Sequence, residues 1–222
     1  MNRITQNPLA LAGLVIIGLI SLMAIFATWI APFDPDAIDV KAILLAPSWE
    51  HIMGTDGLGR DVWSRMLFGA RISLLVGIVA VGISTLIGII LGAIAGYYRG
   101  WVDTVIMRFV DIMLSIPTFF LILAVIAFLT LSIWNIMIVI GLTSWMGVTR
   151  LVRAEFLSLR SREFVLASQT LGAKDYRLIF RHLLPNSLSP IIVSSVLGVA
   201  SAVLVESGLS FLGLGVQAPQ AS

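Results

Sequence analysis

The chain has 222 residues, of which 59% are hydrophobic and only 12% charged, and its mean hydropathy of +1.03 indicates an integral membrane protein. Its apolar runs do not alternate with polar residues as barrel strands do, so a polytopic all-α membrane protein is expected. The chain has no cysteine, which excludes disulfides and thiolate metal sites, and its net charge of +2 gives no indication of nucleic-acid binding.

The N-terminal part predicts one membrane span followed by a long polar loop. Residues 1–8 are a short polar start, and the apolar run at 9–31 is long enough to cross a membrane. No cleavage site of the A-x-A kind precedes the loop, so the run is expected to be an uncleaved anchor rather than a signal peptide. A loop over 32–71 follows. Helical spacing within it predicts an interfacial helix at the outer surface, with an apolar face made of Val62, Met66, Leu67 and Ala70.

The remaining apolar runs predict four more spans, at residues 72–96, 112–131, 133–148 and 187–205. In the first of these, Gly88, Gly92 and Gly96 recur every four residues, which favours close packing against another helix over a role in a pore. Pro117 is expected to kink the next span near its start.

The charges set the orientation of this five-span arrangement. Most arginines fall on one side, together with the polar segment at 149–186. The acidic residues of the 32–71 loop fall on the other side, together with the final loop at 206–222, which is too short to cross again. The positive-inside rule therefore places the N-terminus and the 149–186 segment in the cytoplasm.

The spans give no support to ion-driven transport or to catalysis. Ion-coupled transporters usually carry ionisable groups at depth, whereas Asp111 and Glu206 lie only at span ends, where each could line a pathway or be an interfacial charge. Asp111 can also pair with Arg108, one turn away. Neither lysine follows a glycine, so the chain has no phosphate-binding loop and any ATPase must be a separate chain. His51 and His182 are expected on opposite sides of the membrane, where they cannot form one metal site or dyad.

One cytoplasmic stretch, EFVLASQTLGAKDYRLIFRHLLPN at 163–186, is charged and amphipathic between two apolar spans. Its spacing predicts a short helix with a narrow face of Phe, Ala, Ser and Leu, capped at its start by Ser161 and ended by Gly172. A second short helix is expected to end at Pro185 and to carry an apolar stripe of Tyr176, Ile179, Phe180 and Leu183. Such a helix can lie on the membrane, pack on the bundle or enter a groove of another protein, and its small residues favour the groove.

This stretch resembles the cytoplasmic EAA loop of permease subunits in binding-protein-dependent ABC importers. The Glu-Ala-Ala triplet of that family corresponds to Leu166, Ala167 and Ser168, and its glycine corresponds to Gly172. Because Leu166 stands where the family has glutamate, no role of that glutamate carries over to this chain. The later landmarks of the pattern are Ile179, Leu184 and Pro185.

Two other stretches narrow the resemblance to the C-type subunit of the peptide and nickel branch. MGTDGLGRDVWSRMLFGARISLLVG, at 53–77, is similar to the outer loop and second-span entry of that branch. ESGLSFLGLGVQAPQAS, at 206–222, is similar to the loop before its last span. The family ordinarily has a sixth span after this loop, so the chain is expected to be a C-terminally truncated form of the type I permease bundle.

The resemblance implies a multi-pass protein of the bacterial or archaeal cytoplasmic (inner) membrane that pairs with a homologous permease subunit. Two cytoplasmic ATPase subunits would bind ATP and Mg²⁺, and a substrate-binding protein would dock outside, so the chain itself would be neither an enzyme nor a holder of a cofactor or metal. Its first short helix would act as a coupling helix seated in a cleft of the ATPase, unless the segment only braces the bundle. The residues expected at this contact are Phe164, Ala167, Ser168, Leu171, Gly172, Ala173, Arg181 and His182.

Three alternatives stay open at the level of sequence. Asp56, Arg60 and Asp61 are candidates for an exposed surface that docks the binding protein, although structural bracing would explain the same outer stretch. The expected substrates are di- or oligopeptides, with nickel or a nickel chelate as the second choice. A non-transporting membrane scaffold is the alternative of another class, but it gives no reason for the pattern of the outer loop.

Overall fold

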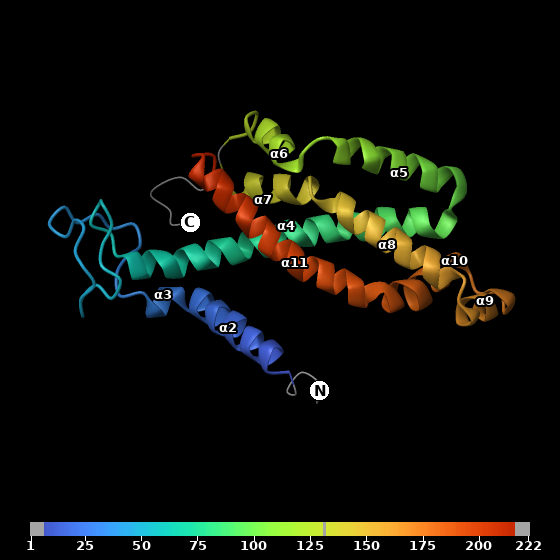
Figure 1. Cartoon of the computed structure of the whole chain (residues 1–222), viewed down its shortest axis with the longest axis horizontal. Helices are drawn as coiled ribbons and strands as arrows, with labels where there is room; N and C mark the ends of the chain where they lie inside the picture. The colour runs from blue at the N-terminus through green and yellow to red at the C-terminus, as the bar shows by residue number, and fades with distance from the viewer. Residues whose placement is uncertain (1–6, 131, 216–222) are drawn as a thin grey trace. The chain divides into compact units, whose positions relative to one another are not determined.

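The computed structural model describes residues 7–130 and 132–215, and every regular element in these ranges is a helix (Figure 1). The all-α fold is therefore confirmed. Contacts divide the chain into two units, one formed by Val76–Glu206 and the other by the described residues before and after it. The helices are α2 (Pro8–Ile25), α3 (Ala27–Ile30), α4 (Val62–Tyr98), α5 (Gly100–Ser115), α6 (Thr118–Ile126), α7 (Ile133–Leu142), α8 (Trp145–Arg160), α9 (Glu163–Thr170), α10 (Asp175–Arg177), the π-helix η1 (Leu178–Leu183) and α11 (Leu184–Phe211).

Several of these helices are suited to cross a membrane. Within the described ranges, four stretches are long and apolar enough, namely Pro8–Ile25, Val62–Tyr98, Ile133–Arg160 and Asp175–Phe211. The pair α5 and α6 is bent by 80° and makes a fifth span if it is counted as one. The bend falls at Ile116 and Pro117, because proline has no N–H to donate and disfavours a helical residue before it. The predicted kink at Pro117 is thus confirmed, as a complete break.

The first unit holds α2, α3, the outer loop and the beginning of α4. The Asn7 side chain accepts a hydrogen bond from the Leu9 amide at 3.1 Å, which caps α2. Arg71 of α4 donates to the Ile25 carbonyl at 2.9 Å and to the Thr28 hydroxyl at 3.3 Å, so it ties α2 and α3 to α4. Most side chains of α2 are exposed, as expected of a helix whose apolar surface faces lipid or another subunit.

Helix α4 begins earlier than expected. It is continuous from Val62 to Tyr98, so the interfacial helix predicted within the 32–71 loop is the first part of α4 rather than a separate element. The Asp61 carboxylate accepts a hydrogen bond from the Ser64 amide at 2.8 Å and so starts the helix, and no proline occurs between Val62 and Tyr98. Helix α11 likewise extends to Phe211, into the segment expected to be a loop.

In the second unit, α4 packs closely on α8 through its glycine stripe. A Cβ atom on Gly92 would lie 2.6 Å from the Thr149 carbonyl oxygen and 2.7 Å from the Val152 Cβ. A Cβ on Gly88 would meet Val148, and one on Gly96 would meet Phe156, both in α8. Only glycine permits this approach, so the interpretation of the stripe as a packing face is confirmed.

Candidate coupling site

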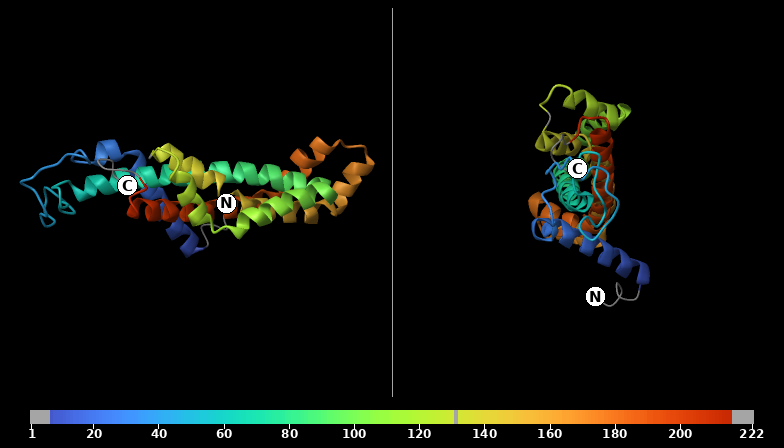
Figure 2. Two further views of the ribbon diagram at one scale, coloured as in Figure 1. Left: turned by 90° about the horizontal axis from the view of Figure 1, so that it is seen from above. Right: turned by 90° about the vertical axis from the view of Figure 1, so that its left-hand side faces the viewer.

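The segment between α8 and α11 forms a projection at one end of the second unit (Figures 1 and 2). Helix α9 follows α8 after two residues and is anchored by Val165, which is fully buried. Val165 belongs to the same core cluster as Phe156 of α8 and Leu178 and Leu183 of η1. Because Val165 is the one buried residue of α9, the helix keeps its other faces open to a partner.

The end of α9 at Gly172 is the one predicted from the sequence. Gly172 has a φ of +79°, in the left-handed region that favours glycine. Its amide donates to the Gln169 carbonyl at 2.9 Å, and the Ala173 amide donates to the Ser168 carbonyl at 3.1 Å. These two bonds are those of a Schellman motif, which satisfies the last carbonyls of the helix and fixes the direction of the chain that leaves it.

The start of α9 differs from the prediction. Ser161 does not cap the helix, because its hydroxyl donates instead to the Ser158 carbonyl at 2.9 Å. Arg162 occupies the position before α9 and makes no capping bond through its side chain. The Ser158 carbonyl in the last turn of α8 is a nearby acceptor for the Ser161 hydroxyl. A bond to this carbonyl competes with a capping bond to the amides of α9.

The second short helix also differs, because its chain does not stop at Pro185. Helix α10 continues into the π-helix η1 and then into α11, and Pro185 is the second residue of α11, directly after the π-helical turn. The predicted apolar stripe is only partly buried, since Tyr176 and Phe180 are exposed. The buried side chains are Leu178 and Leu183, which are five residues apart and share one face because a π-helix bonds each residue to the fifth one along.

The structure brings most of the predicted docking residues together around one pocket. His182 lies beside Ser168, with 3.4 Å between its Nε2 and the Ser168 hydroxyl oxygen. Its ring centre is 6.4 Å from that of Phe164, while Ala167 lies exposed on α9 outside the pocket. Sequence reasoning missed Arg177, which is also part of the lining. The pocket is lined by Ser168, Leu171, Gly172, Ala173, Arg177, Arg181 and His182.

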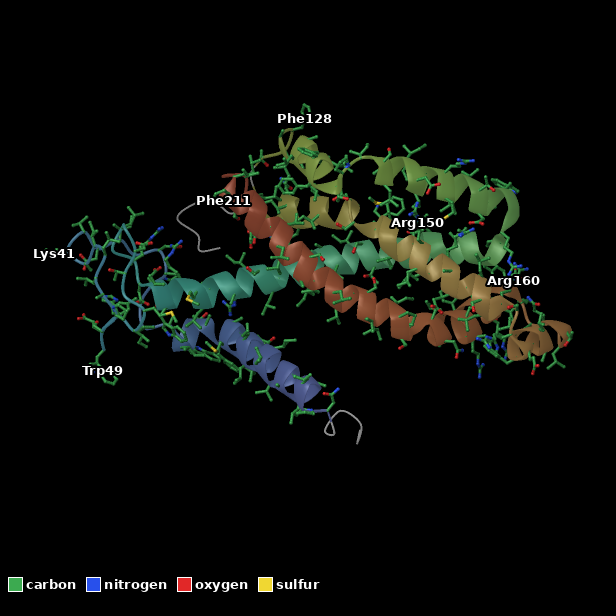
Figure 3. The ribbon with its side chains drawn as sticks, viewed as in Figure 1. Lys41, Trp49, Phe128, Arg150, Arg160 and Phe211 are labelled. Carbon is green, nitrogen blue, oxygen red and sulfur yellow. The ribbon has the colours of Figure 1, made fainter. Side chains whose placement is uncertain are left out.

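A clasp of three side chains holds this projection to the end of α4. The Tyr97 hydroxyl donates to the Asp175 carboxylate at 2.8 Å, just before η1. The Arg160 guanidinium donates to the Tyr97 carbonyl and lies 5.0 Å from the centre of the Tyr97 ring, a cation–π contact. Figure 3 shows Arg160 where α8 ends. No local pattern in the sequence indicates this clasp beyond the aromatic pair at the end of α4.

The clasp leads to a prediction for Tyr97→Phe. This variant loses the bond to Asp175, which is worth about 1 kcal/mol because Asp175 is exposed to water. Amide hydrogen exchange in the segment from 173 to 178 is expected to be about fivefold faster in the intact complex. Tyr98→Phe is the matched control, since the Tyr98 ring is exposed and its hydroxyl has no hydrogen-bond partner in the described part of the chain. Equal exchange in the two variants would contradict the clasp.

Two ion pairs join α5 to α8. Asp103 accepts two hydrogen bonds from Arg153, at 2.5 Å and 2.6 Å, and both side chains are partly buried. Asp111 pairs with Arg150 at 2.5 Å rather than with the Arg108 predicted from helical spacing. The fold places Arg150 of α8 opposite Asp111, so a contact across helices replaces the local one. Glu206, the other predicted pathway residue, is 1% exposed on α11.

The outer loop turns its predicted docking residues inward. Asp61 is only 2% exposed, so the expectation that it lies on the surface is wrong. Its carboxylate bonds the His51 Nδ1 at 2.9 Å as well as the Ser64 amide. Burial raises the pKa of Asp61, but the bonds from Ser64 and His51 outweigh burial and leave the pKa below its usual value.

Asp56 and Arg60 are partly buried and bonded to one another. Arg60 donates from its Nε to the Asp56 carboxylate at 2.8 Å, and the Leu58 and Arg60 amides donate to the same carboxylate. Burial raises the pKa of Asp56, but these backbone and side-chain bonds lower it further than burial raises it. These bonds hold the turn from Asp56 to Arg60 together.

The outside of this loop is largely apolar. Trp49 is fully exposed and Leu44 is exposed on a backbone with a φ of +52°, in the left-handed region that side chains rarely adopt (Figure 3). The strained turn is held by bonds from the Leu44 amide to the Asp56 carbonyl at 3.2 Å and from the Leu45 amide to the Thr55 hydroxyl at 2.8 Å. The loop therefore turns Asp61 inward and exposes several large apolar side chains beside charged ones such as Lys41 and Glu50.

Comparison with known proteins gives this architecture a family. Residues 88–222 match the model of the binding-protein-dependent transport system inner membrane component, and residues 1–47 match the N-terminal TM domain of oligopeptide transport permease C. The oligopeptide transport system permease protein of Bacillus subtilis is 42% identical over 222 residues, which cover 100% of this chain and 73% of that protein. The dipeptide transport system permease protein of Alkalihalophilus pseudofirmus is 44% identical over 218 residues, or 98% of this chain and 72% of that protein. The chain belongs to the family of inner membrane components of binding-protein-dependent transport systems.

Proposed function

We propose that this chain is one of two permease subunits of an ATP-driven ABC importer and helps to form the translocation pathway for di- or oligopeptides. The observation that carries the proposal is the exposed projection formed by α9 and η1 at the end of the bundle. Its open faces suit docking to another protein. The peptide class is supported by full-length relatives named as oligopeptide and dipeptide permeases.

In this proposal α9 seats in a cleft of a cytoplasmic ATPase subunit, which binds ATP and Mg²⁺. Leu171 is 88% exposed at the end of α9, and Phe164 is exposed on the same face. Burying a side chain such as Leu171 against a partner stabilises the contact by about 1.5–3 kcal/mol. The Schellman motif and the clasp hold this surface rigid, so movement of the ATPase is passed to the attached helices.

The charges of the pocket indicate what kind of ATPase surface would fit it. Arg177 and Arg181 both line the pocket, and Leu166 is an exposed apolar residue where the family has glutamate. The matching ATPase surface is therefore expected to carry an acidic group that faces these arginines. It needs no cation at the position opposite Leu166, because α9 has no glutamate there.

The remaining assignments follow from the same proposal. A homologous permease subunit completes the pathway, the N-terminus lies in the cytoplasm, and the outer loop faces the substrate-binding protein. Asp56, Arg60 and Asp61 support the docking surface from inside the loop. Asp111 and Glu206 are the ionisable candidates for the pathway.

An uptake assay tests the proposal. The chain is reconstituted in vesicles with its sister permease, both ATPases and the binding protein, and ATP-dependent uptake of labelled dialanine is measured beside uptake of nickel. Uptake of the dipeptide alone is expected. Uptake of nickel alone would mean that nickel or a nickel chelate, and not a peptide, is the substrate. No uptake by a correctly assembled complex would favour the scaffold alternative.

A further inference from the structure

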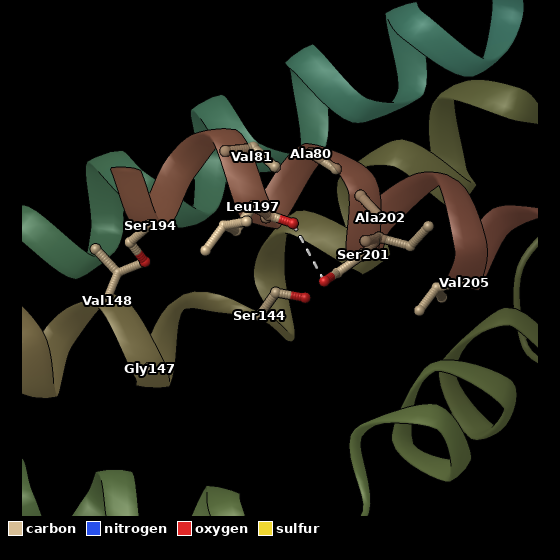
Figure 4. Close-up of a pocket in the computed structure, with 12 residues that line it drawn as sticks. Ala80, Val81, Ser144, Gly147, Val148, Ser194, Leu197, Ser201, Ala202 and Val205 are labelled. Carbon is tan, nitrogen blue, oxygen red and sulfur yellow. Dashed lines mark hydrogen bonds between the residues drawn. The ribbon is translucent and has the colours of Figure 1, made fainter. Parts of the chain in front are cut away.

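The second unit contains a cavity of about 320 Å³ that the coupling site does not use (Figure 4). It lies between α4, the junction of α7 with α8, and α11, and it is lined from the middle of the first two of these apolar stretches and from the second half of Asp175–Phe211. Its lining has no charged side chain and is formed by Ala80, Val81, Ile140, Ser144, Gly147, Val148, Ser194, Leu197, Gly198, Ser201, Ala202 and Val205.

The cavity sits where a membrane-spanning stretch is interrupted. Helix α7 ends at Leu142 and α8 begins at Trp145, so Thr143 and Ser144 are non-helical within the apolar stretch Ile133–Arg160. The Thr143 hydroxyl turns back to the Val139 carbonyl at 2.7 Å, and the Ser144 side chain makes no capping bond. Irregular backbone at membrane depth is tolerated only where protein buries it or where it lines a wet cavity. Ser144 is exposed, which favours the wet cavity.

Three serine hydroxyls face this space from two sides. Ser144 comes from the α7–α8 junction, while Ser194 and Ser201 come from α11 (Figure 4). Within residues 7–130 and 132–215, neither the Ser144 nor the Ser194 hydroxyl has a hydrogen-bond partner, and Ser201 donates only to the Leu197 carbonyl at 3.3 Å. The neighbouring Ser195 differs, because its hydroxyl is used in the contact of α11 with α4, 3.0 Å from Thr85.

This chemistry fits the main chain of a peptide. A hydroxyl can donate to a carbonyl oxygen and accept from an amide N–H, the two groups that every peptide repeats. Small, uncharged walls do not select among side chains, and an acyl chain of lipid would leave the hydroxyls unused. A metal ion would need imidazole, thiolate or carboxylate ligands, none of which lines the cavity.

We propose that this cavity is a peptide-binding subsite of the translocation pathway, in which the hydroxyls of Ser144, Ser194 and Ser201 hydrogen-bond the main chain of a passing peptide. The inference rests on the proposed importer function. It specifies where on this subunit the peptide binds and which side-chain groups bind it.

The absence of cysteine makes a direct test possible, because each serine can be replaced by cysteine in a chain with no other thiol. Ser144→Cys and Ser194→Cys are built into the assembled importer and treated with a membrane-impermeant thiol reagent, with and without dialanine and ATP. Both are expected to react, and dialanine is expected to protect them. Ser195→Cys is the control beside the cavity and is expected to stay unreactive.

The outcomes separate this inference from the importer function. Failure of both cysteines to react would mean that the partner permease or lipid fills the cavity, and reaction without protection by dialanine would mean that peptides pass elsewhere. Either result overturns the subsite. ATP-dependent uptake measured on the same vesicles reports the importer function independently, so loss of the subsite with intact uptake leaves that function standing.

Discussion

Replacement of Ala167 by arginine is expected to abolish stimulation of ATP hydrolysis by substrate while the chain still folds and inserts. Ala167 lies exposed on α9, on the side of Phe164 and Leu171, where a small side chain lets a partner approach closely. An arginine there adds bulk and a charge that the ATPase cleft would have to desolvate without a partner, a cost of several kcal/mol. Stimulated hydrolysis and peptide uptake by the reconstituted complex are therefore expected to fall more than tenfold.

The control for this result is Ser161→Arg. It adds the same side chain to the same segment, at an exposed position between α8 and α9 that lies outside the predicted contact. Co-purification of the ATPase subunits with each variant shows whether the complex forms. Unchanged stimulation in the Ala167→Arg complex would contradict docking through α9, and equal loss in both variants would point to a general effect of charge.

Replacement of Gly92 by valine is expected to give the largest loss of stability. The valine Cβ would lie 2.6 Å from the Thr149 carbonyl oxygen and 2.7 Å from the Val152 Cβ, so α4 and α8 must separate. Such overpacking costs about 1–3 kcal/mol, and the backbone oxygen cannot move aside as a flexible side chain could. The midpoint of thermal unfolding of the purified chain is expected to fall by several degrees.

Gly82→Val is the matched control on the same helix. A Cβ on Gly82 would meet no atom within 4 Å, so this variant makes the same change in helix propensity without the clash. Its unfolding midpoint is expected to stay close to that of the unchanged protein. Equal midpoints for the two variants would mean that the glycine stripe does not set the distance between α4 and α8.

The parts of this fold that could be predicted from the sequence depend on local properties of the chain. Apolar runs predicted the membrane helices, Pro117 predicted the break between α5 and α6, and Gly172 predicted the end of α9. The glycine stripe could be interpreted because four-residue spacing places small side chains on one face. Each of these features is decided within one or two turns of a helix.

The parts that could not be predicted depend on which residues the fold brings together. Helical spacing paired Asp111 with Arg108, whereas α8 supplies Arg150. The bond between Tyr97 and Asp175 joins residues 78 positions apart, and no local pattern announces it. The outer motif was ambiguous for the same reason, since only the folded loop shows that Asp61 is buried beside His51.

The π-helical turn at Leu178–Leu183 leads directly into α11 and holds one residue more than an α-helical turn would. In an α-helix, side chains five residues apart lie about 140° apart around the axis, so Leu178 and Leu183 could not both stay in the core. A change from π to α bonding would thus withdraw one of them and turn the Arg181 and His182 side chains relative to α9. A single shift in hydrogen-bond register at this turn would therefore rotate those side chains about the helix axis.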